Sequence, residues 1–146
     1  MKLYTIGFTQ KSAETFFSLI KKNNIELLID IRLNNKSQLA GFAKGEDLKF
    51  FLKKLSNCEY KYLAEYAPTK EILEGYRKKN IEWDTYVKQY NKLLEERGDY
   101  KKFLEKFSSY ENVCLLCSEA TAEKCHRRLM AELIKKANLK IEIIHI

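Results

Sequence analysis

The chain of 146 residues is long enough to bury one hydrophobic core, and its 45% hydrophobic content is typical of a folded globular protein. No run of residues approaches the roughly 20 apolar positions that cross a bilayer, and the N-terminus lacks the apolar region of a signal peptide. We therefore expect a single domain over residues 1–146, in the cytoplasm and without a membrane partner. A net charge of +7 favours an acidic partner such as a nucleotide or a nucleic acid.

Strand patterns and helix patterns alternate along the chain. The predicted strands, one of which ends at Gly7, cover residues 2–7, 25–32, 60–63, 112–118 and 141–146. The predicted helices start after Ser12, cover 46–55, and cover 122–137 behind a cap at Thr121. Between 33 and 45 the chain is polar, and we expect a functional loop there.

The stretch from 70 to 108 is predicted to be wholly helical. Its three pieces separate near Asn80 and Gly98, with Thr69 and Asp99 as helix caps. Elsewhere strands alternate with helices, which is typical of a parallel sheet with helices on both faces. The sequence therefore predicts a doubly wound α/β domain with one mostly parallel sheet of about five strands and a helical excursion at 70–108.

Polar residues follow three predicted strands, at the edge where open α/β sheets bind their ligands. They are Thr9 after the first strand, Asp30 and Arg32 at the end of the second, and Cys117 and Glu119 at the end of a later one. At about 100° per residue, His126 falls on the apolar side of the last predicted helix and Arg127 at the border of that side. We expect these residues to lie close together.

A metal site is one interpretation of this region. Cys117, Cys125 and His126 are zinc-ligand types, and with Glu119 they loosely resemble the set used by zinc deaminases. The spacing argues against it, because neighbouring residues such as Cys125 and His126 diverge by about 100° on a helix. Cys114 and Cys117, three apart on a strand, should also point to opposite faces.

No dinucleotide-binding motif and no Walker motif occurs in the sequence. The sequence therefore predicts no metal and no other cofactor. A Cys125 nucleophile at a helix start is a further alternative, but free cysteines are more often simply packed, so packing is favoured for both Cys117 and Cys125.

Anion binding beside a proton-transfer group is the chemistry that the remaining residues favour. The candidates are Arg32, Arg127, Ser37 and Thr9 for substrate or anion binding, and Glu119, His126 and Asp30 for proton transfer. Two plainer interpretations stay open. Asp30 and Arg32 form only an internal ion pair in the first, and His126 is a core histidine satisfied by Glu119 in the second.

Three segments carry a resemblance to a known family: "YTIGFTQKSAETFFSLI", "LLIDIRLNNKSQLAGF" and "LLCSEATAEKCHRRLMAELI". The chain resembles the domain-of-unknown-function 488 family, whose Cys-x-Glu and Cys-His-Arg elements correspond to 117–119 and 125–127. Phe8 stands where that family usually has a histidine, and Ser37 lacks the usual arginine neighbour. The resemblance implies a small α/β protein and supports the choice of site, but it implies no particular reaction.

We expect an enzyme, of hydrolase type because no cofactor motif is present, that acts on a phosphate-bearing substrate such as a nucleotide or a nucleic acid. The alternative is a nucleic-acid-binding module without catalysis, in which lysine-rich helices and aromatic side chains bind the strand. The aromatic candidates are Tyr60, Tyr62, Tyr66, Tyr76, Trp83, Tyr86 and Tyr90. The sequence does not indicate an oligomeric state.

Overall fold

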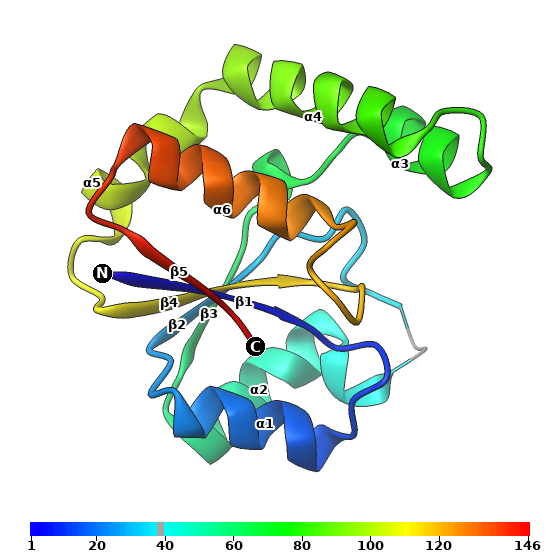
Figure 1. Ribbon diagram of the computed structural model, residues 1–146. Coiled ribbons are helices and arrows are strands. Elements are labelled where there is room, and N and C mark those ends of the chain that lie inside the picture. The colour runs from blue at the N-terminus through cyan, green and yellow to red at the C-terminus, as the bar shows by residue number, and fades with distance from the viewer. Residues whose placement is uncertain (38–39) are drawn as a thin grey trace.

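The computed structural model describes residues 1–37 and 40–146, and it contains one sheet of five parallel strands (Figure 1). In spatial order the strands are β3 (Glu59–Tyr62), β2 (Leu27–Asp30), β4 (Asn112–Cys117), β1 (Lys2–Gly7) and β5 (Glu142–His145). All four strand pairs are parallel. The predicted α/β class and the predicted sheet are therefore confirmed.

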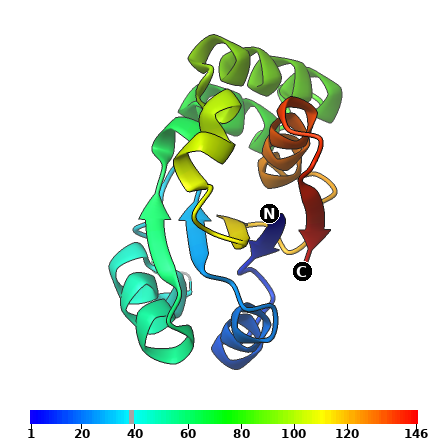
Figure 2. The ribbon, with the colours of Figure 1, turned by 90° about the vertical axis from the view of Figure 1, so that its left-hand side faces the viewer.

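Helices cover both faces of this sheet, as Figures 1 and 2 show. One face carries α1 (Ala13–Lys22) and α2 (Gly45–Ser56). The other carries α3 (Lys70–Arg77), α4 (Trp83–Arg97), α5 (Phe103–Phe107) and α6 (His126–Ala137). In the part of the chain that is described, no helix is both long enough and apolar enough to cross a membrane.

The alternation of side chains along the strands creates two separate cores. Leu3, Ile29 and Leu115 belong to the core beneath α4 and α6, whereas Ile6, Leu28 and Leu116 belong to the core above α1 and α2. Both sets are completely buried, as expected of a parallel sheet with helices on both faces. Cys114 lies in the α1–α2 core and Cys117 has the opposite parity, so these two cysteines face opposite sides, as predicted.

The connections between strands run in two directions from the centre of the sheet. From β1 the chain moves through α1 to β2 and through α2 to β3, toward one edge. From β3 it returns through α3–α5 to β4 and continues through α6 to β5, toward the other edge. Since parallel crossovers are right-handed, opposite directions place the helices on opposite faces. The chain therefore leaves β4 toward one face of the sheet and leaves the neighbouring β1 and β2 toward the other face. The carboxyl ends of these three strands form a topological switch point.

Two helix caps agree with the sequence analysis and two do not. Ser12 accepts a hydrogen bond from the Thr15 N–H and Thr69 accepts one from the Ile72 N–H, so both cap as predicted. The predicted cap at Asp99 is wrong, because Gly98 holds the left-handed conformation (φ 71°) at the break and no side-chain cap bond forms there. The 70–108 excursion is otherwise helical, with breaks where they were predicted.

The last helix starts later than predicted. It begins at His126 rather than at 122, and its N-cap is Cys125, which has an extended backbone (φ −138°, ψ 140°) and makes no side-chain cap bond. Thr121 therefore caps nothing, because residues 118–125 form a connection outside the helix. The predicted loop 33–45 also contains a short 3-10 helix, Gly41–Ala43, while Gln38 and Leu39 lie outside the described residues.

Candidate functional site

A cavity of about 1450 Å³ opens at the carboxyl edge of the sheet. Its floor comes from the segments that follow β1, β2 and β4, which meet at the switch point. Its outer wall comes from the end of α3, the connection to α4 and the first turn of α4. The helical excursion thus brings residues 73–86 over the edge of the sheet, where α/β proteins bind their ligands.

Cationic and aromatic side chains dominate the lining. The cationic residues are Lys11, Arg32, Arg77, Lys79 and Lys124, against the acidic Glu82, Asp84 and Glu119. The aromatic residues are Phe8, Tyr76, Trp83 and Tyr86, with the Trp83 and Tyr86 rings stacked at 5.1 Å between centroids. The cavity therefore offers positive charge and flat apolar surface together.

Asp30 and Arg32 form a closed polar cluster beside the cavity. Arg32 donates from Nε and Nη2 to the two carboxylate oxygens of Asp30 at 2.8 and 2.6 Å, and both residues are almost completely buried. The Tyr60 hydroxyl donates to the same carboxylate at 2.7 Å, and Arg32 also donates to the Ala43 carbonyl. The Phe8 ring lies 5.2 Å from the guanidinium carbon. The internal ion pair that the sequence left open is therefore present.

The charges in this cluster reinforce one another. Burial alone would lower the pKa of Arg32, but the hydrogen bond and the charge of Asp30 outweigh it, and the pKa of Arg32 is raised. Burial and the adjacent Asp30 charge raise the pKa of Tyr60. The tyrosine consequently stays protonated and donates its hydroxyl proton to the carboxylate.

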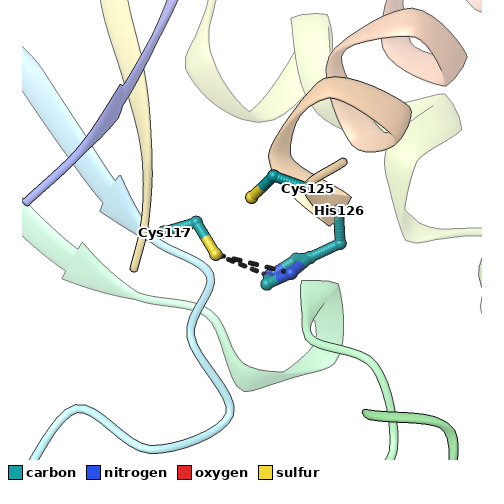
Figure 3. Close-up of side chains that lie close together, drawn as sticks. All are labelled: Cys117, Cys125 and His126. Carbon is teal, nitrogen blue, oxygen red and sulfur yellow. Dashed lines mark hydrogen bonds between the residues drawn. The ribbon is translucent and has the colours of Figure 1, made fainter. Parts of the chain in front are cut away.

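A second cluster, formed by Cys117, Cys125 and His126, lies on the α6 side of the same edge (Figure 3). Cys117 Sγ is 3.4 Å from His126 Nδ1 and 3.6 Å from Nε2. All three side chains are buried and line the cavity. The expectation that Cys125 and His126 diverge is wrong, because Cys125 precedes the helix and its extended backbone turns its side chain toward Cys117.

His126 is held by groups that fix the orientation of its ring. Its Nε2 lies 2.9 Å from the Ile31 carbonyl oxygen, and the Tyr90 ring packs edge-on with centroids 5.7 Å apart. A carbonyl only accepts, so Nε2 carries the proton in this contact, and Nδ1 is the ring nitrogen that is left to other partners. The Ile31 carbonyl thus satisfies this histidine, and not Glu119 as in the interpretation that the sequence left open.

Arg127 organises the connection between β4 and α6. Its Nη1 donates to the Glu119 carbonyl at 2.5 Å and to Cys125 Sγ at 3.5 Å, and Nη2 donates to the Ala120 carbonyl at 3.4 Å. Gly7 allows this connection to approach β1, since a Cβ at position 7 would clash with the Glu119 carbonyl oxygen. Arg127 is only 1% exposed.

The two cavity cysteines differ in acidity. Burial alone would raise the pKa of Cys117, but hydrogen bonds from Cys125 and from the Ser118 and Glu119 backbone, together with the Arg127 charge, lower it. The hydrogen bond that Cys125 makes to Cys117, together with burial, raises the pKa of Cys125. Cys117 is therefore the more acidic of the two thiols, and Cys125 is its hydrogen-bond donor.

The structure brings most of the predicted site residues to the cavity but not all of them. Those that line it are Thr9, Arg32, Ser37, Glu119 and His126. Asp30 and Arg127 are not among the lining residues. The Asp30 carboxylate accepts from Arg32 and Tyr60, and the Arg127 guanidinium donates to backbone carbonyls. The predicted role of Asp30 in proton transfer and that of Arg127 in anion binding stay predictions.

The sequence did not predict the outer wall, and it favoured packing for Cys117 and Cys125, which the structure places together at the cavity. Tyr76, Trp83 and Tyr86 were considered only as part of an aromatic set for nucleic-acid binding, and nothing local indicated that α3 and α4 cover the cavity. The signal for Cys125 was its position next to His126, which the misplaced helix start concealed.

These features define a doubly wound α/β protein with a ligand-sized cavity at the switch point of its sheet. The chain belongs to the family described as Domain of unknown function DUF488, which matches residues 12–134 and so contains both cysteine elements. The resemblance seen in the sequence is thus confirmed. Neither the curated proteins nor the solved structures include a significant match to this chain.

Proposed function

We propose that this protein is a hydrolase that binds a phosphate-bearing substrate, such as a nucleotide or the end of a nucleic acid, in the cavity at the carboxyl edge of the sheet. The observation that carries the proposal is the convergence, in one cavity, of cationic side chains, an aromatic wall and the buried pair of Cys117 and His126. A phosphate favours the cations, and a nucleobase favours the aromatic wall.

The positive charge is placed for anion binding from several directions. Lys11 and Arg32 follow β1 and β2, Lys124 precedes α6, and Arg77 and Lys79 lie in the outer wall. Burial and the charge of Arg127 lower the pKa of Lys11, so this lysine gains from an anion nearby. The first turn of α6 adds backbone N–H groups and the positive end of the helix dipole beside the cavity.

Two groups that can move protons, His126 and Glu119, line this cavity. The Nδ1 lone pair of His126 suits it as a general base, and Glu119 lies exposed among the lining residues. Asp30 contributes indirectly, because its carboxylate holds the Arg32 guanidinium in a fixed position. We also propose a cytoplasmic location, which the four free, buried cysteines support.

The test is a hydrolysis screen with nucleoside mono-, di- and triphosphates and short oligonucleotides, in which released phosphate and nucleoside are measured. His126→Ala is expected to lower turnover by about 10²- to 10⁴-fold, the usual contribution of a general base. His145→Ala is the matched control, because His145 is the only other histidine and does not line the cavity. Equal turnover of the His126 variant and the wild type on a cleaved substrate would overturn the assignment.

A nucleic-acid-binding module without catalysis is the second candidate, favoured by the charge of +7 and by Tyr76 and Trp83 in the outer wall. Tyr66 and Tyr90 support it less, because both are buried in the core and do not line the cavity. Salt-dependent binding of single-stranded DNA or RNA that is weakened by Trp83→Ala, but is unchanged in His126→Ala, would favour the module over the enzyme.

A further inference from the structure

Cys117, Cys125 and His126 bring three metal-ligand atoms within 4.8 Å of one another. Cys117 ends β4, whereas Cys125 and His126 open α6, so the set joins two segments that the fold holds together. Figure 3 shows the three side chains directed into the space between the end of the strand and the start of the helix. All three belong to the cavity lining.

We propose that these residues bind a thiophilic divalent transition metal of the zinc class, through two thiolates and the Nδ1 atom of His126. Zinc takes sulfur and imidazole ligands in a tetrahedral arrangement, and sites with three protein ligands keep a fourth position open. Because all three ligands line the cavity, the open position faces the cavity.

The distances within the set fit such an ion. Tetrahedral zinc with ordinary bond lengths separates a thiolate sulfur from an imidazole nitrogen by roughly 3.6 Å. Cys117 Sγ and His126 Nδ1 are 3.4 Å apart, which matches this edge of the tetrahedron in length. Because Sγ also lies 3.6 Å from Nε2, binding needs a rotation of the ring that directs Nδ1 at the ion. The 4.8 Å limit covers Cys125 as well, and a rotation of its side chain brings the second sulfur to bonding distance.

The surrounding groups are those that orient metal ligands. A metal-bound histidine commonly donates its other ring N–H to a backbone carbonyl, and His126 Nε2 lies 2.9 Å from the Ile31 carbonyl oxygen. This contact leaves Nδ1 as the free ligand atom on the side of the sulfurs. Arg127 Nη1 donates to Cys125 Sγ at 3.5 Å, which stabilises negative charge on that sulfur.

The charges of the site also balance. Two thiolates neutralise a divalent cation, so the loaded site adds no net charge to its buried surroundings. Arg127 lies beside it and donates to carbonyls and to Cys125, while the described residues place no carboxylate within ion-pair distance of its guanidinium. A neutral metal–dithiolate centre can therefore occupy this position without opposing the arginine.

Metal binding does not depend on the proposed hydrolase function, whereas the use of the open position does rest on it. In the loaded site Nδ1 of His126 is a ligand and no longer a general base, so proton transfer would fall to Glu119. An ion in this position would present a bound water or a substrate phosphate oxygen to the cationic lining of the cavity. The two inferences are separable, because metal loading is measured without any substrate.

The full chain without a histidine tag is produced in zinc-supplemented medium and purified. Its metal content is then measured by inductively coupled plasma mass spectrometry. About one zinc ion per chain is expected. The metal-free protein is also titrated with Co²⁺, which should give a thiolate-to-cobalt charge-transfer band and the intense visible bands of a tetrahedral ion. Cys117→Ser, Cys125→Ser and His126→Ala should each lose these bands or weaken them strongly.

Cys58→Ala and Cys114→Ala are the matched controls, since both cysteines are free and buried in the α1–α2 core away from the cavity. They should keep full metal content and the cobalt spectrum. Circular dichroism separates a ligand loss from a loss of fold in every variant, and the wild-type spectrum decides the matter even where a variant fails to fold. A wild-type protein that takes up no zinc and gives no thiolate–cobalt band would overturn the proposal. A Cys117–Cys125 disulfide that forms in the metal-free protein and is not prevented by zinc would overturn it too.

Discussion

The carboxyl edge of the sheet carries two buried polar clusters that differ in how completely their members satisfy one another. In the Asp30–Arg32–Tyr60 cluster, charged hydrogen bonds of 2.6 to 2.8 Å join the side chains. In the Cys117–Cys125–His126 cluster, the contacts between sulfur and ring are 3.4 and 3.6 Å, and all three side chains face the cavity. The first cluster is closed, and the second is open to a ligand.

This difference separates support from chemistry. The loss of one partner from a buried ion pair is strongly destabilising, because the remaining charge is buried without compensation. Weak sulfur contacts cost little to exchange for a stronger ligand, so the second cluster is free to change partners. We expect the first cluster chiefly to stabilise the edge, with only Arg32 presented to a ligand, and the second to change partners when a ligand binds.

Removal of Asp30 is the strongest test of this division. Asp30→Ala leaves Arg32 as a buried charge without its partner, which should lower the free energy of unfolding by about 3–5 kcal/mol. Cys117→Ala in metal-free protein should cost only about 1 kcal/mol, a typical cost for a point substitution. Urea denaturation of both variants measures the two costs. Equal costs would show that the clusters do not differ in the way described.

Arg127 links the open cluster to the backbone, and its replacement should have the next largest effect. Arg127→Met leaves the carbonyls of Glu119 and Ala120 without their donor, at an expected cost of about 2 kcal/mol. The connection between β4 and α6 should loosen as well, so Cys125 should react faster with a thiol reagent. Arg128→Met, on the more exposed neighbour, is the control and should change neither quantity.

Tyr60 tests how much of the closed cluster depends on its third member. Tyr60→Phe removes one hydrogen bond to the Asp30 carboxylate but keeps the ring, so the expected loss is about 1.5 kcal/mol. Denaturant titration beside Asp30→Ala gives the comparison. A loss as large as that of Asp30→Ala would place the tyrosine, rather than the ion pair, at the centre of the cluster.

Replacement of His145, which lies outside both clusters, should have the smallest effect on stability. Its Nδ1 contacts the Thr5 hydroxyl at 2.6 Å. Burial and the charge of Arg127 lower its pKa below the ordinary value of 6.5. As the pH falls, the unfolded chain therefore takes up a proton on His145 before the folded chain does. The stability that His145 contributes is complete above pH 6.5 and is lost as the pH drops through the pKa of the folded state. Melting curves of the wild type and of His145→Asn on both sides of that value should show a shallower acid decline in the variant. Identical declines would contradict this assignment.

The sequence predicted the sheet well because its signals are local. An apolar run such as 27–29 has few alternatives to a doubly buried strand, and Ser12 and Thr69 cap by contacts within three residues. The predicted start of α6 was wrong because the true start depends on contacts that are not local. Arg127 donates to the carbonyls of Glu119 and Ala120 in the preceding connection, and no local pattern reveals these contacts.

The site was predicted in part, for a related reason. Strand ends placed Thr9, Arg32 and Glu119 correctly at the cavity, since parallel strands end at one edge. The outer wall depends on how α3 and α4 pack over that edge, which is set by tertiary contacts such as the stacking of Trp83 and Tyr86 with Tyr76. The convergence of Cys125 with Cys117 depended on the helix start and was missed with it.

The order of the strands also sets the order in which this protein can fold. β4 lies between β1 and β2, so these first two strands never pair with each other. The partners of β1 are β4 and β5, and β4 begins only at Asn112. During synthesis, β1 therefore leaves the ribosome with both edges unpaired and keeps them unpaired until most of the chain has followed. A chain cut short before Asn112 contains no native partner for its first strand.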